Sequence, residues 1–382
     1  MKKILVVLVA AALSWASVAI AQDQPVRSIV NVTGDLYRFQ ENNHYGVFLV
    51  TDEGIILADP ISHDNAQWLK GQLAEQFGVP VKYVIYSHDH ADHTSGGEVF
   101  ADTATFVAHE NAAPKIAASG HTPVPDETDF KNIKPFGIKK IVSLGGKRVE
   151  LYFFGSSHSD NLISIYFPKE RALFQVDSVA VDRLPYRDLP DYYLSAPNVL
   201  RLIYNFIDFK ILIPGHGPIG TKKHFISHQK YLENLQMKVA NALIKGLTVE
   251  EAKKKINLKK YKKWGQYENW RDLNIEGMYR VFLEEEEYLP FHKVAGSYPL
   301  SAARNGQCGW VIVQYDVDEE GRTKNIRVFD SEPKKIFDKA GINAAKKYRY
   351  IPNNPTKNVK TRTTYELAGI CEVPPPRDIN NE

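Results

Sequence analysis

A polar cluster that directly follows an apolar strand limits the folds open to this sequence. Residues Val81–Tyr86 have the apolar, β-branched composition of a buried strand, and the next segment, Ser87–His93, reads Ser-His-Asp-His-Ala-Asp-His. Five potential metal ligands fall within six consecutive residues, and burying so many polar side chains without partners is expensive. Because packing alone does not account for such a segment, the sequence predicts a ligand-bearing loop at the end of a strand.

Three later segments also end strand-like runs with a histidine or an aspartate. They are Gly155–His158, Val176-Asp177 and Gly215-His216. Taken singly, each histidine is more typical of a loop, and Asp177 of a turn or a helix cap. The ordered set H-x-H-x-D-H, followed by His, Asp and His at long spacings, instead predicts a shared metal site. Imidazole and carboxylate ligands without a thiolate suit Zn²⁺, and Fe or Mn can occupy such sites in principle.

These motifs resemble the metallo-β-lactamase superfamily, over roughly Ile29 to Tyr288. The resemblance implies an α/β fold, an αββα sandwich of two packed sheets, with a dinuclear site at one edge and two zinc ions as cofactors. Carried over onto this sequence, it implies that His88, His90 and His158 hold one ion, that Asp92, His93 and His216 hold the other, and that Asp177 bridges both, as in the glyoxalase II-like branch.

A dinuclear site of this kind predicts hydrolysis of a small-molecule substrate. Two metal ions clamp a bridging water and lower its pKa from about 15.7 toward about 7, which yields a hydroxide at neutral pH. We expect this hydroxide to attack a carbonyl, phosphoryl or sulfuryl centre, while Asp92, the expected catalytic residue, orients the hydroxide and shuttles a proton. The expected substrate is an ester, lactone, amide, thioester, phosphate or sulfate.

Two other chemistries stay open on this resemblance. β-Lactam hydrolysis is disfavoured by Asp177, which stands where the lactamases with a zinc-binding cysteine carry that cysteine, and by Ala180, which stands where they carry a lysine for the drug carboxylate. The subfamily without that cysteine also lacks the bridging aspartate. A single iron ion for redox chemistry is disfavoured by the complete second set of ligands, which includes His93 and His216.

Residues near the predicted site leave further alternatives open. Asp59 either supports the ligands through a hydrogen bond or forms a turn before Pro60. His44 and Tyr45 lie in an expected loop before the strand at Val47–Thr51, where the family often has a flap over the site. Substrate contact by this flap is one interpretation.

The walls of the substrate pocket are expected to come from the loops Gly120–Lys134 and Asp182–Tyr193. The second loop offers Arg183 or Arg187 to an anionic substrate. A surface ion pair is an equal interpretation for either arginine.

Alternating strand-like and helix-like segments from Gln22 to about Gly217 predict sheets with helices outside. Short β-rich runs at residues 36–40, 47–51 and 54–58 predict an antiparallel meander. The apolar spacing of residues 65–77 predicts a helix that ends at Gly78.

From Lys222 to Tyr288 the pattern is helical. The lysine run Lys253–Lys263 is interpreted as a solvated helix face because Glu250 and Glu251 adjoin it. His224 and His228 are four residues apart on a predicted helix, and surface positions are a better interpretation than a metal pair. With a formal net charge of only +3, nothing favours nucleic acid as a partner.

Residues 1–21 have the pattern of a bacterial export signal. Lys2 and Lys3 precede the apolar stretch Ile4–Leu13, and Ala19–Ala21 forms a small-x-small cleavage site before Gln22. An uncleaved membrane anchor is the alternative. We expect cleavage, a periplasmic or secreted protein, and no stable membrane span afterwards, because no other apolar run of about 18 residues follows.

The composition shifts again near Ala295, after which the sequence predicts strand, turn, strand, helix and strand. The segments Gly306–Val311, Tyr315–Gly321 and Tyr348–Pro352 resemble the TonB C-terminal domain, over about Ala295–Leu367. This resemblance implies a small α+β domain whose strand edge can receive a peptide from a protein partner, for docking, dimerisation or stabilisation. A periplasmic adaptor acting through this domain is the alternative to an enzyme.

The sequence therefore predicts four regions. They are a signal peptide at residues 1–21, a hydrolase domain at 22–290 with a helical tail at 222–290, a TonB C-terminal-like domain at 296–372 and a tail at 373–382. The only cysteines, Cys308 and Cys371, flank the third region. In an exported chain they are expected to form a disulfide, provided that the first and last strands of that domain are antiparallel neighbours.

Overall fold

The computed structural model describes residues 24–120, 123–132, 137–187, 189, 191–284, 296, 298–350, 355–365 and 373. The expected signal peptide at residues 1–21, Cys371 and all but the first residue of the expected tail lie outside the described residues. Within the described part of the chain, no helix is both long and apolar enough to cross a lipid bilayer.

Six strands form the first sheet, in the same order as along the chain. They are β1 (Arg27–Thr33), β2 (Leu36–Glu41), β3 (His44–Thr51), β4 (Gly54–Ala58), β5 (Val81–Ile85) and β6 (Thr105–Val107). The strands β1 to β4 pair antiparallel, which confirms the predicted meander and adds β1 to it. Because β4, β5 and β6 pair in parallel, the segments that follow them start from one edge of the sheet.

Seven strands form the second sheet, with β13 at one edge and β7 at the other. They are β7 (Lys131–Asn132), β8 (Ile138–Leu144), β9 (Lys147–Phe153), β10 (Ser164–Phe167), β11 (Ala172–Phe174), β12 (Ile211–Ile213) and β13 (Gly220–Thr221). The neighbours β11 and β12 pair in parallel, so their carboxyl ends lie at the same edge. The other neighbouring strands pair antiparallel.

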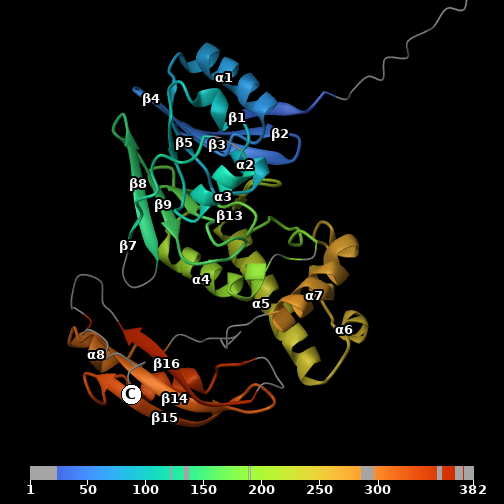
Figure 1. Cartoon of the computed structure of the whole chain (residues 1–382), viewed down its shortest axis with the longest axis vertical. Coiled ribbons are helices and arrows are strands. Elements are labelled where there is room, and N and C mark those ends of the chain that lie inside the picture. The colour runs from blue at the N-terminus through green and yellow to red at the C-terminus, as the bar shows by residue number, and fades with distance from the viewer. Residues whose placement is uncertain are drawn as a thin grey trace, which may run out of the picture.

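The two sheets pack against each other through their apolar faces. Val47 and Leu49 of β3 belong to the same buried cluster as Leu151 of β9 and Ile165 of β10. The helices on the outer faces are α1 (His63–Phe77) and α3 (Ala112–Ser119) on the first sheet, and α4 (Ala196–Phe206) and α5 (Lys222–Ile244) on the second (Figure 1). These layers form the expected αββα sandwich.

Local signals set both ends of α1. The hydroxyl of Ser62 accepts a hydrogen bond from the backbone N–H of Asn65, which caps the first turn. Gly78 closes the helix with a φ of 66°, in the left-handed region that glycine adopts without strain. The predicted helix is confirmed, and its true start lies two residues earlier.

The helical segment expected after the second sheet is present, and short helical elements also lie between the strands. Those of the first region are α2 (Ala91–Thr94), α6 (Val249–Lys255) and α7 (Tyr267–Glu284), with short 3-10 turns η1 (Gly97–Phe100), η2 (Asp191–Leu194) and η3 (Lys259–Tyr261). On α6, Lys253 forms ion pairs with Glu250 and Glu276 at 2.9 and 2.7 Å. The lysine run therefore lies in a mixed-charge environment, as expected for a solvated face.

The last unit is a three-stranded antiparallel sheet with two helices. Its elements are α8 (Leu300–Arg304), β14 (Gly309–Val317), β15 (Thr323–Glu332), α9 (Asp338–Ala345) and β16 (Thr356–Tyr365), and β14 lies in the centre of the sheet. Buried Val311, Val313 and Tyr315 of β14 form a core with Ala344 of α9. This is the small α+β domain that the sequence predicts, and α8 is an addition.

The first and last strands of this unit, β14 and β16, are antiparallel neighbours, as the disulfide interpretation requires. Gly309 is paired with Tyr365, and buried Cys308 immediately precedes Gly309. Because Cys371 lies outside the described residues, its pairing with Cys308 stays a prediction.

Candidate metal centre

The first ligand segment leaves the first sheet at the carboxyl end of β5. Tyr86 still pairs with the next strand through its backbone N–H, which donates to the carbonyl oxygen of Val107. The following residues turn away from the sheet and enter α2 at Ala91. His88 and His93 are fully buried, with 0% and 1% of their surfaces exposed. Their imidazoles are thus held inside the protein, at the edge of the sandwich.

The later ligand segments come from the second sheet and reach the same edge. His158 follows β9, Asp177 follows β11 and His216 follows β12. A hydrogen bond of 2.9 Å from the backbone N–H of Ile163 to the carbonyl oxygen of Ser87 joins the loop of His158 to the first segment. All seven residues that the sequence predicts as ligands therefore come together in space.

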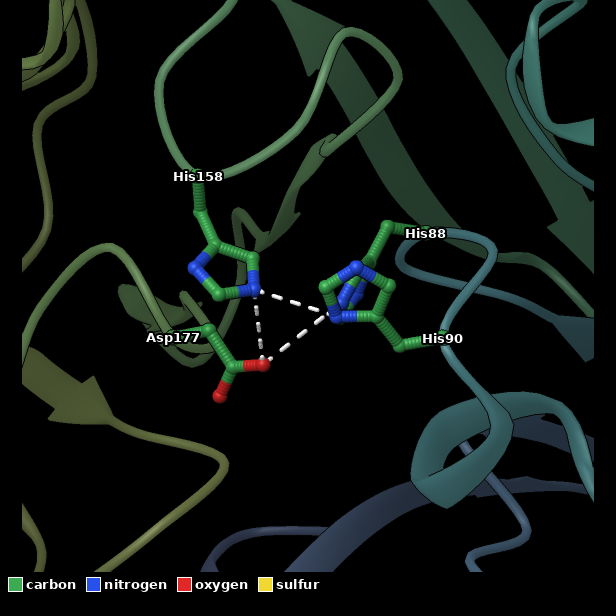
Figure 2. Close-up of side chains that lie close together, drawn as sticks. All are labelled: His88, His90, His158 and Asp177. Atoms are coloured by element: carbon green, nitrogen blue, oxygen red, sulfur yellow. Dashed lines mark hydrogen bonds and ion pairs between the residues drawn. The ribbon is translucent and has the colours of Figure 1, made fainter. Parts of the chain in front are cut away.

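Four of these side chains form a first group, which Figure 2 shows. They are His88, His90, His158 and Asp177, each with one ligand atom within 4.8 Å of those of the others. Nε2 of His158 lies 3.2 Å from Nδ1 of His90 and 3.4 Å from Oδ2 of Asp177. The two histidines of the first loop face His158 and Asp177 across a small gap (Figure 2).

A second group shares Asp177 with the first. Its members are Asp92, His93, Asp177 and His216, and their ligand atoms also lie within 4.8 Å of one another. Nε2 of His216 lies 3.0 Å from Oδ1 of Asp177, and Nε2 of His93 lies 3.2 Å from Oδ2. Each carboxylate oxygen of Asp177 therefore faces imidazole nitrogens, and Oδ2 contacts histidines of both groups.

In His93, His216 and His88, a hydrogen bond at Nδ1 leaves Nε2 as the ring nitrogen that faces the other candidate ligands. Nδ1 of His93 donates to Oδ2 of Asp59 at 2.8 Å, and Nδ1 of His216 donates to the carbonyl oxygen of Asn43 at 3.1 Å. The hydroxyl of Ser87 donates to Asp59, so Nδ1 of His88, 3.1 Å from this hydroxyl, must be the donor of that contact. Neutral rings in this tautomer present the Nε2 lone pair that a metal ion requires.

Whether these two groups fit metal ions can be judged from the buried polar atoms that have no hydrogen-bond partner. Nε2 of His88, Nε2 of His93 and Oδ1 of Asp177 are such atoms when the rings are neutral, because an Nε2 without a proton and a carboxylate oxygen are both acceptors. Orphaned atoms of this kind are expensive, and a bound ion is one of the few explanations for several of them in one place. Nitrogen and oxygen donors without thiolate suit Zn²⁺. The residues present therefore fit two divalent metal ions that share Asp177.

Asp59 supports this arrangement from the buried side. Its carboxylate is 0% exposed and accepts hydrogen bonds from the backbone N–H of Ser87 at 2.8 Å and from the Ser87 hydroxyl at 2.7 Å. It also accepts the bond from His93 described above. Of the two roles left open by the sequence, support of the ligands agrees with this geometry, and Asp59 does so with a left-handed φ of 56°.

Burial and nearby carboxylates shift the pKa values of the candidate histidine ligands in opposite directions. Burial lowers the pKa of His158 to about 4, although the Asp177 carboxylate opposes this shift. Burial also disfavours protonated His216, but hydrogen bonds with Asp177 and Asp92 outweigh it and raise the pKa to about 9. Burial acts likewise on His93, and the carboxylates of Asp177 and Asp59 raise its pKa well above the usual value. Protons therefore compete with metal ions for the second group.

His44 and Tyr45 lie in strand β3, so the expected loop at this position is wrong. The backbone N–H of Tyr45 donates to the carbonyl oxygen of Gly215 at 2.9 Å, which ties the strand to the segment of His216. Nε2 of His44 lies 3.5 Å from Oδ2 of Asp92, and the rings of His44 and His216 meet edge to face at 4.7 Å. The strand thus places His44 beside the second group.

The histidine pair on α5 has two different environments. His224 accepts a hydrogen bond from the backbone N–H of Thr221 and completes a capping box at the start of the helix. His228 is 1% exposed, so the expected surface position is wrong for this residue. Its ring is parallel to that of Trp264, and its Nδ1 accepts a hydrogen bond of 3.3 Å from the backbone N–H of Ala180. His228 therefore helps to hold the chain just after Asp177.

A cavity of about 830 Å³ opens onto the metal groups. One wall carries ligand residues and His44. The rest of the lining comes from two segments that are distant from each other in the sequence, residues 179–193 and 266–280. Of the two loops expected to form the walls, Asp182–Tyr193 contributes as predicted, whereas none of the described residues of Gly120–Lys134 lines this cavity.

Helix α7 contributes to this cavity, which the sequence does not predict. Trp270 and Arg280 of α7, and Gln266 just before it, line the same cavity as the candidate ligands. They lie in the segment interpreted only as a helical tail. No spacing in the sequence points to them, because the fold of the intervening helices alone brings α7 to the site.

Two family models match this chain. The model described as "Metallo-beta-lactamase superfamily" matches residues 43–235, and the model described as "Gram-negative bacterial TonB protein C-terminal" matches residues 295–368. The first match covers the described ligands of both groups. The second covers the three-stranded unit.

Curated relatives share moderate identity with the first region. The chain is 29% identical over 201 residues to the 2,4-dinitroanisole O-demethylase subunit alpha of Nocardioides sp. strain JS1661, a match that covers 50% of this chain and 58% of the relative. It is 25% identical over 164 residues to a metallo-beta-lactamase type 2 of Elizabethkingia meningoseptica, with 41% and 63% covered. The chain thus spans less than two thirds of the length of either relative.

Among solved structures, the chain is similar to a stereoselective inverting sec-alkylsulfatase from Pseudomonas sp. The TM-score is 0.55 at 15% sequence identity, and the likeness covers 68% of this chain and 50% of the other. At this identity the likeness concerns the fold alone.

Proposed function

The chain belongs to the metallo-beta-lactamase superfamily, and on this premise we propose that it is a binuclear, zinc-dependent hydrolase. The observation that carries the proposal is the position of Asp177, which is shared by two compact groups of potential ligands. His88, His90 and His158 would hold the first ion, and the ligands of the second ion would be Asp92, His93 and His216. One carboxylate shared by two groups of histidines suits a site that holds two metal ions close together.

Two divalent ions bound at this site would lower the pKa of a water molecule and polarise the bond to be hydrolysed. The protein's own part in the reaction centres on Asp92, whose side chain is 41% exposed at the cavity. Burial alone would raise the pKa of Asp92, but hydrogen bonds with His216 and His44 lower it well below the usual value. Asp92 therefore stays ionised, and its Oδ2 can accept a hydrogen bond that orients a water molecule.

The substrate is proposed to be a small molecule with an ester, lactone, amide, thioester, phosphate or sulfate group. The names of the relatives add two candidates for assay, a methyl ether of an electron-poor arene and a secondary alkyl sulfate. β-Lactam hydrolysis is the weaker alternative, because Asp177 and Ala180 differ from the lactamase pattern that includes a zinc-binding cysteine.

Export and a protein partner are further parts of the proposal. The sequence pattern of residues 1–21 supports secretion to the periplasm or beyond. The TonB C-terminal match supports docking of a protein or peptide at the three-stranded unit, whose strands β15 and β16 are its edges. An adaptor without enzymatic activity is the alternative, and it would recover a partner in a pull-down whether or not zinc is bound.

Metal content and turnover test the proposal together. The purified mature chain is expected to contain two zinc ions, with little iron, and to hydrolyse at least one member of a panel of the candidate substrates, including β-lactams. A chelator should abolish this turnover and zinc should restore it. His88→Ala should remove turnover, whereas His63→Ala, a change at an exposed histidine of α1, should not. Turnover that survives both chelation and His88→Ala would refute the hydrolase mechanism.

A further inference from the structure

The part of the cavity wall formed by residues 179–193 and 266–280 is mainly apolar and aromatic. Leu189 and Tyr193 are buried there, and the rings of Tyr186 and Trp270 meet edge to face with centroids 5.2 Å apart. Such a wall suits the apolar or aromatic body of a small molecule. The few polar groups of this wall can therefore discriminate between ligands that share an apolar body but carry different polar groups.

Arg183 places a cation in this wall. Its guanidinium carbon lies 5.4 Å from the centre of the Trp270 ring, a cation–π contact. Its Nε is buried and has no hydrogen-bond partner. Among the residues that the structure describes, no carboxylate forms an ion pair with Arg183. The Asp177 carboxylate acts on the guanidinium through space and offsets part of the cost of its burial. Because no ion pair completes this compensation, an anionic group that enters the cavity would be stabilised there.

The backbone holds Arg183 in a fixed position. The N–H of Gly265 donates to the carbonyl oxygen of Asp182 at 2.8 Å, and the N–H of Leu184 donates to the carbonyl oxygen of Gly265 at 3.1 Å. The stem of Arg183 packs on Gly265, since a Cβ at that position would lie 3.4 Å from Cγ of Arg183. Little conformational freedom remains to be lost when a ligand binds, which favours affinity.

Arg187, the other candidate in the same loop, has a different position. Its side chain is exposed, and its guanidinium carbon lies 5.8 Å from the centre of the Tyr186 ring. Arg187 does not line the cavity, whereas Arg183 does. The structure thus separates two residues that the sequence leaves equivalent, and Arg187 serves as a matched control.

We propose that Arg183 is a specificity-determining residue that selects substrates with an oxyanion, a carboxylate or a sulfonate-like group, on an apolar or aromatic body. The guanidinium donates charge-assisted hydrogen bonds to the anion, and the wall around Trp270 receives the body. This inference rests on the proposed function, because it assigns the substrate class of the same cavity. It adds a requirement for an anionic group on the substrate, which the metal ligands alone do not impose.

Binding to metal-free protein tests the inference apart from catalysis. The probes are 4-phenylbutyrate, 3-phenylpropanesulfonate and the neutral 4-phenylbutyramide, titrated calorimetrically at millimolar concentration into the chelator-treated mature chain. The wild-type protein should bind at least one anion more tightly than the amide, and the anion that binds identifies the oxyanion preferred. Arg183→Gln, which keeps much of the stem on Gly265, should weaken that binding about tenfold, and Arg187→Gln should change it less than about twofold.

Several results would overturn the inference. They are equal binding of the anions and the amide, no binding of either anion to the wild-type protein, and unchanged binding by Arg183→Gln. A thermal unfolding midpoint of Arg183→Gln close to that of the wild type would show that the loop is intact, and Arg183→Lys, which keeps the charge, should retain part of the binding.

Kinetics of the zinc-loaded protein separate this inference from the proposed function. The matched substrates are mono-4-nitrophenyl glutarate and its neutral methyl ester. The ratio of their kcat/KM values should favour the anion, and Arg183→Gln should lower this ratio about tenfold. Hydrolysis of both esters without preference would refute the role of Arg183 and leave the hydrolase intact. Hydrolysis of neither would count against the hydrolase, while the binding titration would still decide the role of Arg183.

Discussion

Oδ2 of Asp59 lies 2.8 Å from Nδ1 of His93, and both side chains are buried. The same carboxylate accepts two hydrogen bonds from Ser87, the first residue of the ligand loop. Asp59, which directly follows β4, thus fixes the tautomer of His93, a proposed ligand. It also fixes the path of the loop that carries His88 and His90. Removal of this carboxylate should therefore act on the metal site without touching a proposed ligand directly.

Asp59→Asn is expected to weaken zinc binding about 10- to 100-fold, the usual effect of losing the partner that orients a histidine ligand. The measurement is competition for zinc with a chromophoric chelator. Asp64→Asn, a change at an exposed aspartate in the first turn of α1, is the control and should leave zinc affinity unchanged. Equal affinities of Asp59→Asn and wild type would mean that Asp59 does not orient the site.

Gly215→Ala is expected to displace His93. An added Cβ would lie 2.9 Å from Cβ of Val176 and 3.1 Å from Cε1 of His93, so the ring must move. We expect a loss of stability of roughly 1–3 kcal/mol and weaker binding of one zinc ion per chain. Gly71→Ala is the control, because a Cβ at this helical position meets nothing within 4 Å and should stabilise α1 slightly. Full zinc content in Gly215→Ala would contradict the close packing of this edge.

Buried His228 should make the fold sensitive to acid. Burial, aided by the charge of Arg183, lowers the pKa of His228 to about 3 in the folded chain. Above pH of about 6.5 the ring is neutral in both the folded and the unfolded chain, and it does not affect stability. Below that pH only the unfolded chain takes up the proton, so the free energy of unfolding falls as pH falls, by about 1.4 kcal/mol per pH unit for this group.

His228→Gln, which retains an acceptor for the backbone N–H of Ala180, should reduce this dependence on pH. The measurement is urea unfolding of both metal-free proteins at pH 7, 6 and 5. The wild type should lose more stability than the variant over this range. Parallel pH profiles would show that His228 does not titrate as its burial implies.

A disulfide between Cys308 and Cys371 should stabilise the C-terminal unit. Cys308 is buried beside Gly309, whose strand partner is Tyr365, six residues before Cys371 in the sequence. In the chain-entropy account, closing so long a loop contributes about 4 kcal/mol. Thiol labelling of the denatured, unreduced protein should find no free thiol, and Cys371→Ser should lower the unfolding midpoint of this unit. Labelling of two thiols in protein isolated from an oxidising compartment would contradict the pairing.

The convergence of the seven candidate ligands could be predicted from sequence because it depends on local signals. His88, His90, Asp92 and His93 are nearly contiguous, and the partners Asp177 and His216 directly follow short apolar strands. Strands that pair in parallel bring their carboxyl ends to one edge, so such residues meet even though they are far apart along the chain. The overall layers follow from the same alternation of apolar strands and helices.

The cavity could not be predicted in the same way, because the wall formed by residues 179–193 and 266–280 depends on tertiary packing. Trp270 reaches it only through the arrangement of α5, η3 and α7, which share one buried cluster. His228 has the polar character of a surface residue, yet its helix turns it toward Trp264 and Ala180. His44 continues β3 because it pairs with Glu41 of β2, and the backbone N–H of Tyr45 adds a contact with Gly215, 170 positions away.

The central claim is that Asp177 joins two metal ions. A crystal of the zinc-loaded mature chain, measured on both sides of the zinc absorption edge, tests it most directly through the anomalous difference map. Two peaks are expected, one within bonding distance of Asp177 and the group of His88, and the other within bonding distance of Asp177 and the group of His93. A single peak, or peaks that Asp177 does not contact, would contradict the binuclear site and the hydrolase proposed from it.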